Sequence, residues 1–213
     1  MRFLEFKNKV SKWPYIKSQD LTKFADNKQT IRNQLYRWQK QGLIKKLKKG
    51  LYILNETDRK INPSKPFFAN HLYSPSYVSL EYALNFYGLI PERVFAVTSV
   101  TTKKTKTINN ELGPFIYRKI KKNAYRGFKR EQDESGLSYF MADAEKAVLD
   151  ILYLSTSKFN HISKNTFSSF FRFQNTEILD LQKLAEYQKL YHSKKLDRII
   201  NKFINFVKET NYA

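Results

Sequence analysis

The strongest constraint on the fold is an amphipathic helical pattern that stops at a glycine and leads directly into a β-prone segment. Ile31, Leu35 and Trp38 recur at helical spacing within residues 28–41 and form one apolar stripe. Gly42 then marks the end of the helix, because glycine readily adopts the left-handed conformation common at helix C-termini. Two short β-prone runs around a glycine turn follow, which predicts a hairpin. The runs are residues 43–47 and 51–54, and the turn is Lys48-Lys49-Gly50.

Two shorter helices are expected before this pattern. Residues 2–12 carry mostly one-sided apolar side chains, and a second short helix opens at Ser18–Leu21 with Phe24 as an apolar anchor. Asp26 or Asn27 is the expected N-cap of the third helix, because either side chain accepts free backbone amides. Three helices followed by a basic hairpin predict a winged helix-turn-helix. The apolar residues of the first helix are Phe3, Leu4, Phe6 and Val10.

The face of the third helix opposite the apolar stripe carries side chains suited to DNA. Guanidinium, ammonium and amide groups donate to guanine, pair with adenine or contact phosphate. A recognition helix uses its first turns on base edges, so Gln29, Arg32, Asn33 and Tyr36 are the expected readers. A solvated polar helix face is the alternative interpretation. The whole outer face consists of Lys28, Gln29, Arg32, Asn33, Tyr36, Arg37 and Lys40.

Positive charge is concentrated in the same region. Residues 1–62 hold 16 Lys and Arg against 5 Asp and Glu, whereas residues 63–213 hold 23 against 14. The whole chain has a net charge of +20, which favours a polyanionic partner such as nucleic acid. A lysine-rich surface without a partner is the alternative. The hairpin lysines expected to contact the DNA backbone or minor groove are Lys45, Lys46, Lys48 and Lys49.

Composition excludes several other classes of protein. The chain has no cysteine, which excludes disulfide scaffolds, thiolate zinc sites and cysteine nucleophiles. It has no apolar run long enough to span a membrane and no signal-peptide pattern, so we expect a cytoplasmic protein without membrane contact. Asn62–Pro66 is a short stiff segment. It divides the chain into a predicted DNA-binding domain, residues 1–62, and a second domain, residues 63–213.

The second domain alternates short β-prone runs with amphipathic stretches. We expect an α+β fold with a mostly antiparallel sheet covered by helices, and a helical tail after residue 156. The polar residues 101–107 are expected to be a connection. The expected strands are residues 94–100, 115–120, 125–130 and 137–141, and the expected helices are residues 80–87, 144–154, 177–191 and 194–209.

Several segments, in this order along residues 15–155, resemble the AbiEi family of abortive-infection antitoxins. The glycine-flanked hairpin is similar to the wing of that family, and the helical tail has no counterpart in the resemblance. The segments are Gly42–Ile44, Lys49–Tyr52, Tyr77–Leu84, Tyr87–Glu92, Val97–Thr102, Tyr117–Arg118 and Ala142–Asp150.

The resemblance implies a non-enzymatic antitoxin of a type IV toxin–antitoxin system. In that family the winged helix represses the protein's own operon by binding double-stranded DNA at its promoter. The C-terminal domain counters a nucleotidyltransferase toxin, and a stable complex with that toxin is not required. No cofactor is implied.

A metal-dependent nuclease with a winged helix for targeting is the alternative function. Asp143, Glu145 and Lys146 are the residue types of a metal nuclease centre. However, Asp143 stands where a helix N-cap is expected, and Glu145 lies in the first turn, where a carboxylate suits the helix dipole. Lys146 is then expected to be a solvated neighbour. The histidines have no metal-ligand spacing and are expected at the surface: His71, His161 and His192.

A second basic surface is expected on the C-terminal domain. Three of its lysines lie in the polar connection after the strand at residues 94–100. Arg118 and Lys119 project to opposite sides of a later strand, because side chains alternate along a strand. Of these two, Arg118 is expected to join the surface. Nucleic acid is the expected partner and simple solvation the alternative. The surface comprises Lys103, Lys104, Lys106 and Arg118.

Overall fold

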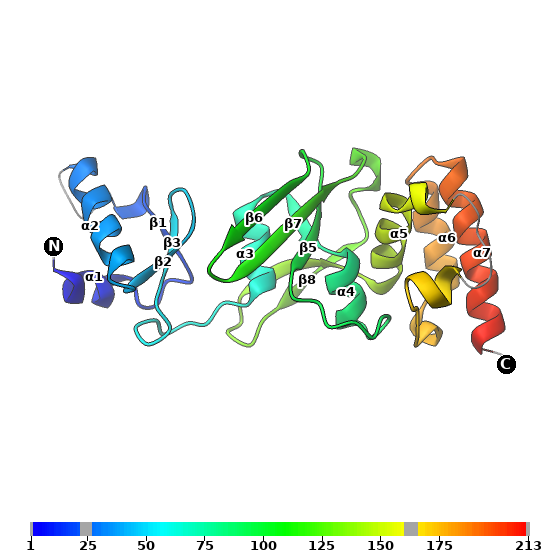
Figure 1. Ribbon diagram of the computed structural model, residues 1–213, viewed down its shortest axis with the longest axis horizontal. Coiled ribbons are helices and arrows are strands. Elements are labelled where there is room, and N and C mark those ends of the chain that lie inside the picture. The colour runs from blue at the N-terminus through cyan, green and yellow to red at the C-terminus, as the bar shows by residue number, and fades with distance from the viewer. Residues whose placement is uncertain (1, 22–26, 160–165, 212–213) are drawn as a thin grey trace.

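The computed structural model describes residues 2–21, 27–159 and 166–211. The chain is arranged as three groups of elements in a row (Figure 1). A small sheet with two helices lies at one end, a six-stranded sheet occupies the middle, and the C-terminal helices lie at the other end. The mixed content confirms the expected α+β class.

The first group, here called the N-terminal unit, contains the predicted helix and hairpin. Helix α2 (Lys28–Lys40) is followed by the antiparallel strands β2 (Ile44–Lys48) and β3 (Leu51–Leu54). Strand β1 (Ile16–Lys17) was not predicted and pairs with the other edge of β3. Helix α1 (Phe3–Val10) precedes them. Ser18 and Gln19 form a turn, Asp20 and Leu21 have 3-10 helical conformation, and the predicted positions Phe24 and Asp26 lie outside the described residues.

Two predictions for these helices can be compared directly with the structure. The Asn27 side chain accepts a hydrogen bond from the Gln29 amide at 2.8 Å, so Asn27 is the N-cap of α2. Phe6 and Val10 are fully buried, but Leu4 is 65% exposed, so its predicted burial is wrong. A helix turns by about 100° per residue, which places Leu4 outside the face shared by Phe6 and Val10.

The apolar stripe of α2 is buried as predicted. Ile31, Leu35 and Trp38 pack in one cluster with Phe6, whose ring stacks on Trp38 with 4.5 Å between centroids. Gly42 has a φ of +70°, as expected for a residue that ends a helix in the left-handed conformation. Burial of the stripe leaves the opposite face of α2 to solvent.

The central sheet has the strand order β6-β7-β5-β4-β9-β8. Three of its five pairings are antiparallel, whereas β5 with β7 and β4 with β9 are parallel. Residues 101–107 were expected to be a connection. In the structure Thr101 ends β5, and Lys106 already belongs to the edge strand β6, which pairs with β7. The strands are β4 (Ser76–Val78), β5 (Val97–Thr101), β6 (Lys106–Asn110), β7 (Gly113–Lys119), β8 (Phe128–Gln132) and β9 (Ser138–Ala142).

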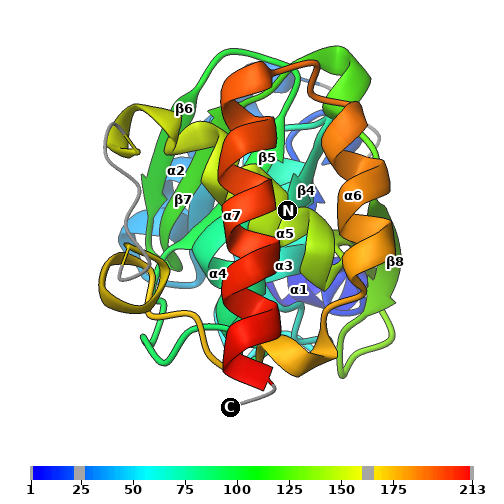
Figure 2. The same cartoon turned by 90° about the vertical axis from the view of Figure 1, so that its right-hand side faces the viewer.

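Helices pack against the sheet, and the last helices form a further group at the C-terminal end of the molecule. Helix α3 (Lys65–Leu72) begins inside the predicted stiff segment Asn62–Pro66. It packs on one face of the sheet, where the Tyr117 hydroxyl donates to the Ala69 carbonyl oxygen at 2.7 Å. Helix α4 packs against β5 and α5, and the tail helices α6 and α7 pack on α5 (Figure 2). The remaining helices are α4 (Leu80–Phe86), α5 (Ala144–Leu154), α6 (Leu181–Lys189), α7 (Lys194–Asn211), the 3-10 turns Lys122–Ala124, Thr156–Lys158 and Thr176–Ile178, and the π turn Thr166–Phe170.

The hairpin belongs to two hydrophobic cores at once. Ile44 and Leu54 pack with the N-terminal unit, whereas Leu47, Leu51 and Ile53 join the large core of the C-terminal part, here called the C-terminal unit. Apolar contacts therefore cross the boundary predicted near residue 62. Polar contacts cross it as well, because the Asn110 side-chain amide donates to the Leu47 carbonyl oxygen at 3.1 Å and the Ser135 hydroxyl donates to the Asn62 carbonyl oxygen at 3.0 Å.

This shared core predicts that the two units unfold together. Leu51→Ala should destabilise the chain by about 2–5 kcal/mol, the usual cost of truncating a buried leucine. Both tryptophans, Trp13 and Trp38, lie in the N-terminal unit, so their fluorescence reports that unit while far-ultraviolet circular dichroism reports the whole chain. Urea transitions followed by the two signals should coincide and shift together in the variant.

The control for this experiment is Leu4→Ala, because Leu4 is exposed. It should change the free energy of unfolding by less than about 0.5 kcal/mol. A fluorescence transition that precedes the circular dichroism transition in the wild type would show that the units unfold separately.

Candidate nucleic-acid interface

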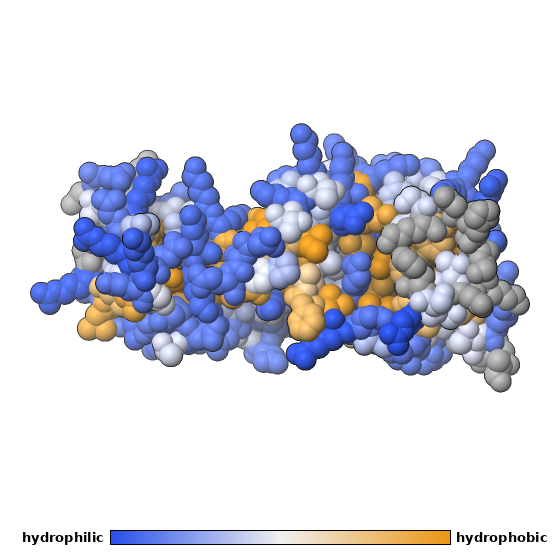
Figure 3. Space-filling model, viewed as in Figure 1, coloured by the Kyte–Doolittle hydropathy of each residue, from blue (hydrophilic) through white to orange (hydrophobic). Residues whose placement is uncertain are grey.

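The outer face of α2 is the most exposed polar helix face of the N-terminal unit. Helix α2 lies at the end of the molecule away from the central sheet (Figure 1). Its buried stripe fixes the rotation of the helix, so the side chains on the opposite face are exposed. Hydrophilic residues cover most of this end on the face seen in Figure 3. Lys28 lies in α2, but its side chain is outside the described part. The exposed predicted residues are Gln29, Arg32, Asn33, Tyr36, Arg37 and Lys40.

The chemistry of this face suits an anion. Helix α2 contains two lysines and two arginines and no acidic residue, so no carboxylate of its own competes for them. Gln29 donates to the Asn33 side-chain oxygen at 3.1 Å, which orients two amides side by side. The Lys40 ammonium lies 4.9 Å from the centre of the Tyr36 ring. The face therefore offers amide, guanidinium and ammonium donors along one helix side.

The hairpin lysines do not form one surface. Lys46 and Lys49 are exposed, and Lys45 is half-buried beside Glu56, with 3.3 Å between the ammonium and the carboxylate. Lys48 instead turns toward the C-terminal unit. The register of the hairpin shifts between Lys46 and Lys48, which changes the direction of the strand at this point. Only Lys46 and Lys49 are therefore fully open to a partner.

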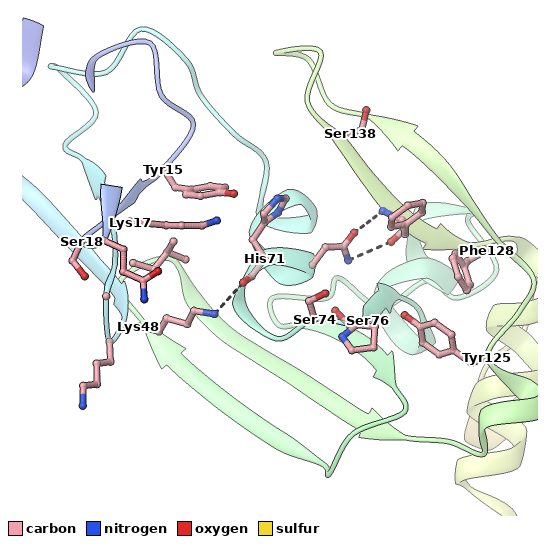
Figure 4. Close-up of a pocket in the computed structure, with 17 residues that line it drawn as sticks. Tyr15, Lys17, Ser18, Lys48, His71, Ser74, Ser76, Tyr125, Phe128 and Ser138 are labelled. Carbon is pink, nitrogen blue, oxygen red and sulfur yellow. Dashed lines mark hydrogen bonds between the residues drawn. The ribbon is translucent and has the colours of Figure 1, made fainter. Parts of the chain in front are cut away.

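Lys48 binds the C-terminal end of α3. Its ammonium donates to the carbonyl oxygens of His71 at 3.0 Å and Leu72 at 2.8 Å (Figure 4). A cation is favoured there, because the last carbonyls of a helix carry partial negative charge. Burial lowers the pKa of Lys48, and the positive charges of Lys106 and Lys103 lower it further. Lys48 thus fixes the hairpin to α3 rather than extending toward DNA.

The structure separates Arg118 from the lysines expected to accompany it. Lys106 is paired with Tyr117, so its side chain lies on the α3 face of the sheet, with its ammonium 5.3 Å from the Tyr73 ring. Arg118 is the next residue along β7 and projects to the opposite face, where it lines a hollow of about 370 Å³ with Arg93. Choosing Arg118 over Lys119 was therefore wrong, because the alternation puts Lys119 on the Lys106 side.

The two other lysines of that predicted surface remain near Lys106. The Lys103 ammonium donates to the Ser74 carbonyl oxygen at 2.5 Å and lies 5.6 Å from the centre of the Tyr73 ring. Lys104 is exposed, and its carbonyl oxygen accepts a hydrogen bond from the Tyr73 hydroxyl at 3.1 Å. These lysines gather around Tyr73, beside the cleft between the two units.

The acidic motif at the start of α5 has structural partners. The Asp143 side chain accepts from the Lys146 backbone amide at 2.9 Å, which confirms the N-cap. The Lys183 ammonium of α6 lies 2.9 Å from Asp143 and 3.0 Å from Glu145. Both carboxylates are thus paired with the helical tail. Within the described ranges, no group of three or more His, Asp or Glu side chains is placed to hold a metal ion.

Lys146 is buried rather than solvated, which corrects the expectation from the sequence. Its ammonium pairs with Asp150 and donates to the Tyr191 hydroxyl at 2.5 Å, and both charged side chains are fully inaccessible. Asp150 also accepts from Tyr77 at 2.9 Å and Ser79 at 2.8 Å. An i,i+4 Lys–Asp pair on a helix whose other residues are apolar except Glu145 was the available signal in the sequence.

The tail helix completes this buried cluster. Tyr191 follows α6 and donates to Asp150 at 2.6 Å, so the charged pair is enclosed by residues from both ends of the C-terminal unit. Burial raises the pKa of Tyr77 and Tyr191 well above the ordinary tyrosine value, and the Asp150 charge adds to the shift. Burial lowers the pKa of Lys146, and Asp150 opposes that change. Both tyrosines therefore stay neutral donors.

The two histidines in the described part of the chain, His71 and His192, belong to no group placed to hold a metal ion. His71 is half-buried against Phe67, with 4.2 Å between ring centroids, and its Nδ1 lies 2.8 Å from the Phe67 carbonyl oxygen. Its predicted surface position is therefore wrong in part. His192 is exposed as expected, and His161 lies outside the described residues.

The buried pair predicts a large and non-additive effect on stability. Lys146→Met should destabilise the chain by about 3–5 kcal/mol, because it leaves Asp150 buried without its cation. The double variant Lys146→Met, Asp150→Leu should lose less unfolding free energy than the two single variants lose in sum, by about 0.5–3 kcal/mol. Urea unfolding of all four proteins measures this coupling.

The matched control is Lys129→Met, which removes an exposed lysine that lies 2.8 Å from Glu131. An exposed pair contributes about 0–1 kcal/mol, so this variant should unfold close to the wild type. Additive single changes at Lys146 and Asp150 would show that the two groups do not stabilise each other.

Comparison with known proteins does not assign this chain to a family. No protein-family model matches this chain, and no curated protein matches its sequence. None of the helices in the described ranges is both long and apolar enough to cross a membrane. A function therefore has to be proposed from the residues of this chain and their positions.

Proposed function

We propose that this protein is a cytoplasmic, non-enzymatic DNA-binding repressor of its own promoter and the antitoxin of a type IV toxin–antitoxin system. The observation that carries the DNA-binding part is the outer face of α2, which is exposed, free of acidic residues and fixed in rotation by a buried stripe. The antitoxin part follows from the resemblance of the C-terminal segments to the AbiEi family. The partners proposed are double-stranded DNA and, functionally, a nucleotidyltransferase toxin.

A winged helix-turn-helix is the proposed fold of the N-terminal unit. Helix α1 precedes α2, Gly42 ends α2, and an antiparallel hairpin follows at once. Helix α2 packs against β2, so its apolar side rests on the small sheet and its polar side is free. A helix presented in this way can enter the major groove, which is about 12 Å wide and admits an α-helix.

Specific roles follow for the exposed side chains. Arg32 suits the two acceptors of guanine, and Asn33 suits adenine, because each can form two hydrogen bonds to a base edge. Both lie in the first two turns of α2, the part of a recognition helix that contacts bases. Lys46 and Lys49 are the proposed phosphate contacts of the hairpin, and they position the protein without reading sequence.

The segments that resemble antitoxins converge in three dimensions. Tyr77 and Ser79 come from one such segment and Lys146 and Asp150 from another, and hydrogen bonds join all four in the buried cluster. This convergence supports the proposal that the segments preserve a common framework. It also accounts for the tail, whose Tyr191 encloses the cluster.

Metal-dependent DNA cleavage has weaker support. The carboxylates of Asp143 and Glu145 are already paired with Lys183, and Asp143 also caps α5. A metal ion would have to displace the Lys183 ammonium from both. Cleavage of plasmid DNA that depends on magnesium and is lost in Asp143→Asn would favour the enzyme instead.

The first test concerns promoter recognition. The double variant Arg32→Ala, Asn33→Ala should lose about 2–6 kcal/mol of preference for its own promoter, because each bidentate base contact discriminates by about 1–3 kcal/mol. Non-specific binding should persist, since phosphate contacts supply it. Footprinting and anisotropy titrations on promoter and scrambled duplexes measure both quantities.

The control is Arg198→Ala, which removes an exposed arginine from α7, far from α2. This variant should bind both duplexes like the wild type. An unchanged promoter footprint in the double variant would exclude α2 as the reading helix.

The second test separates repression from antitoxicity. Because the hairpin is part of both cores, point variants are better suited than a fragment of the C-terminal unit. At matched protein levels, cells with the neighbouring nucleotidyltransferase gene should be rescued by the Arg32→Ala, Asn33→Ala protein, although a promoter reporter is no longer repressed. Loss of rescue would show that antitoxicity requires the DNA-reading face.

A further inference from the structure

A cavity of about 730 Å³ lies between the N-terminal unit and the C-terminal unit (Figure 4). Its first side is formed by β1 and the turn of the hairpin, and its second side by the end of α3 and by residues of β4, β8 and β9. This volume is within the range of small-molecule sites, about 300–1,000 Å³. The cavity is distinct from the outer face of α2.

The first side of the cavity is cationic. Lys17, Lys48 and Lys49 line it, and none of the described residues that line it is an aspartate or a glutamate. Lys103 and Lys106 stand close enough to Lys48 for their charges to oppose its protonation. Three like charges therefore line the hollow and two more lie near Lys48, and their mutual repulsion is relieved when an anion binds among them.

Lys48 is held in place on this side of the cavity. Its two hydrogen bonds to the α3 carbonyls use two of the three donors of an ammonium group. Lys17 extends beside the Tyr15 ring, with its ammonium 5.5 Å from the ring centre. Figure 4 shows Lys17 and Lys48 reaching from the hairpin side toward His71. The cation side is therefore held by fixed elements rather than by a loose loop.

The second side of the cavity is aromatic. Tyr125, Phe128 and Phe140 line it, and the Phe140 ring is 46% exposed although it lies in the central sheet. The Phe128 and Phe140 rings meet edge to face, with 5.6 Å between centroids. The Asn70 side chain accepts from the Phe140 amide at 2.5 Å, which holds this part of β9 against α3. The result is an open, rigid aromatic wall.

We propose that this cavity binds a nucleoside phosphate, with the phosphate at Lys17 and Lys49 and the base against Phe140. A simple anion would contact the lysines but not the aromatic wall, and an apolar ligand would contact the aromatic wall but not the lysines. The ligand is either a free nucleotide or one unit of a single-stranded nucleic acid, because both present a base and a phosphate. A duplex does not expose a base face and is too wide for the cavity.

This site does not depend on the proposed promoter binding. The α2 face and the cavity share no residue, and Lys49 of the hairpin is the one residue assigned to both proposals. Substitutions at Arg32 and Asn33 therefore test promoter binding, and substitutions at Lys17 and Phe140 test the cavity. Failure of one proposal therefore leaves the other intact.

The test uses the full chain and three probes in calorimetric titrations: ATP, inorganic tripolyphosphate and a single-stranded oligoadenylate of eight nucleotides. ATP, the oligoadenylate or both should bind, and tripolyphosphate should bind more weakly. Binding of ATP alone identifies a free nucleotide as the ligand, and binding of the oligoadenylate alone identifies a single strand. Absence of binding by both, or tripolyphosphate binding as tight as that of the better nucleotide probe, overturns the proposal.

Variants then locate the binding. Phe140→Ala should weaken binding about tenfold, the lower part of the range for one stacked base. Lys17→Ala should weaken it and, for the oligoadenylate, reduce the slope of affinity against salt by about 0.7. The controls are Lys195→Ala, an exposed lysine of α7, and the double variant Arg32→Ala, Asn33→Ala. Binding that is lost in either control but retained in Phe140→Ala and Lys17→Ala also overturns the proposal.

Discussion

The rest of the structure depends on a hairpin that is buried on both sides. In β2 and β3, Ile44 and Leu54 face one core, and Leu47, Leu51 and Ile53 face the other. A segment with apolar residues in both directions cannot lie at the surface of a separate domain, because one set would face water. The hairpin therefore joins the two units. The direction in which α2 points and the walls of the cavity both follow from this position.

A second constraint sits at the opposite end of the C-terminal unit. An ion pair as deeply buried as Lys146 with Asp150 tolerates little displacement, because each charge depends on the other for compensation. Three hydroxyl groups complete the coordination of Asp150, and one of them belongs to the tail. The tail helices therefore do more than cover apolar surface, since they close a polar cluster that would be costly to leave open.

The sequence predicted the local elements better than their partners. Periodicity and a glycine stop were enough to place α2 and its hairpin, because these signals depend on neighbours in the chain. Strand β1 has only two residues, Ile16 and Lys17, and forms because β3 offers an edge, which no local pattern reveals. Lys48 and Lys146 look like ordinary surface lysines in the sequence. Lys48 is held by the end of α3, which long-range packing brings to it. Asp150 lies on the same helix as Lys146, but the pair is enclosed only when Tyr191 packs against it from the distant tail.

The positive charge is divided between two surfaces, the outer face of α2 and the cavity, and these differ in shape. On α2 the positive groups lie along a convex helix face, which matches a groove of duplex DNA in shape. Around the cavity they lie in a concave hollow opposite aromatic rings, where a duplex cannot enter but a single base can. Charge attracts any polyanion to both places, whereas shape decides which form of nucleic acid each accepts. The hairpin lies between the two surfaces. A ligand in the cavity therefore contacts the hairpin, against which α2 packs.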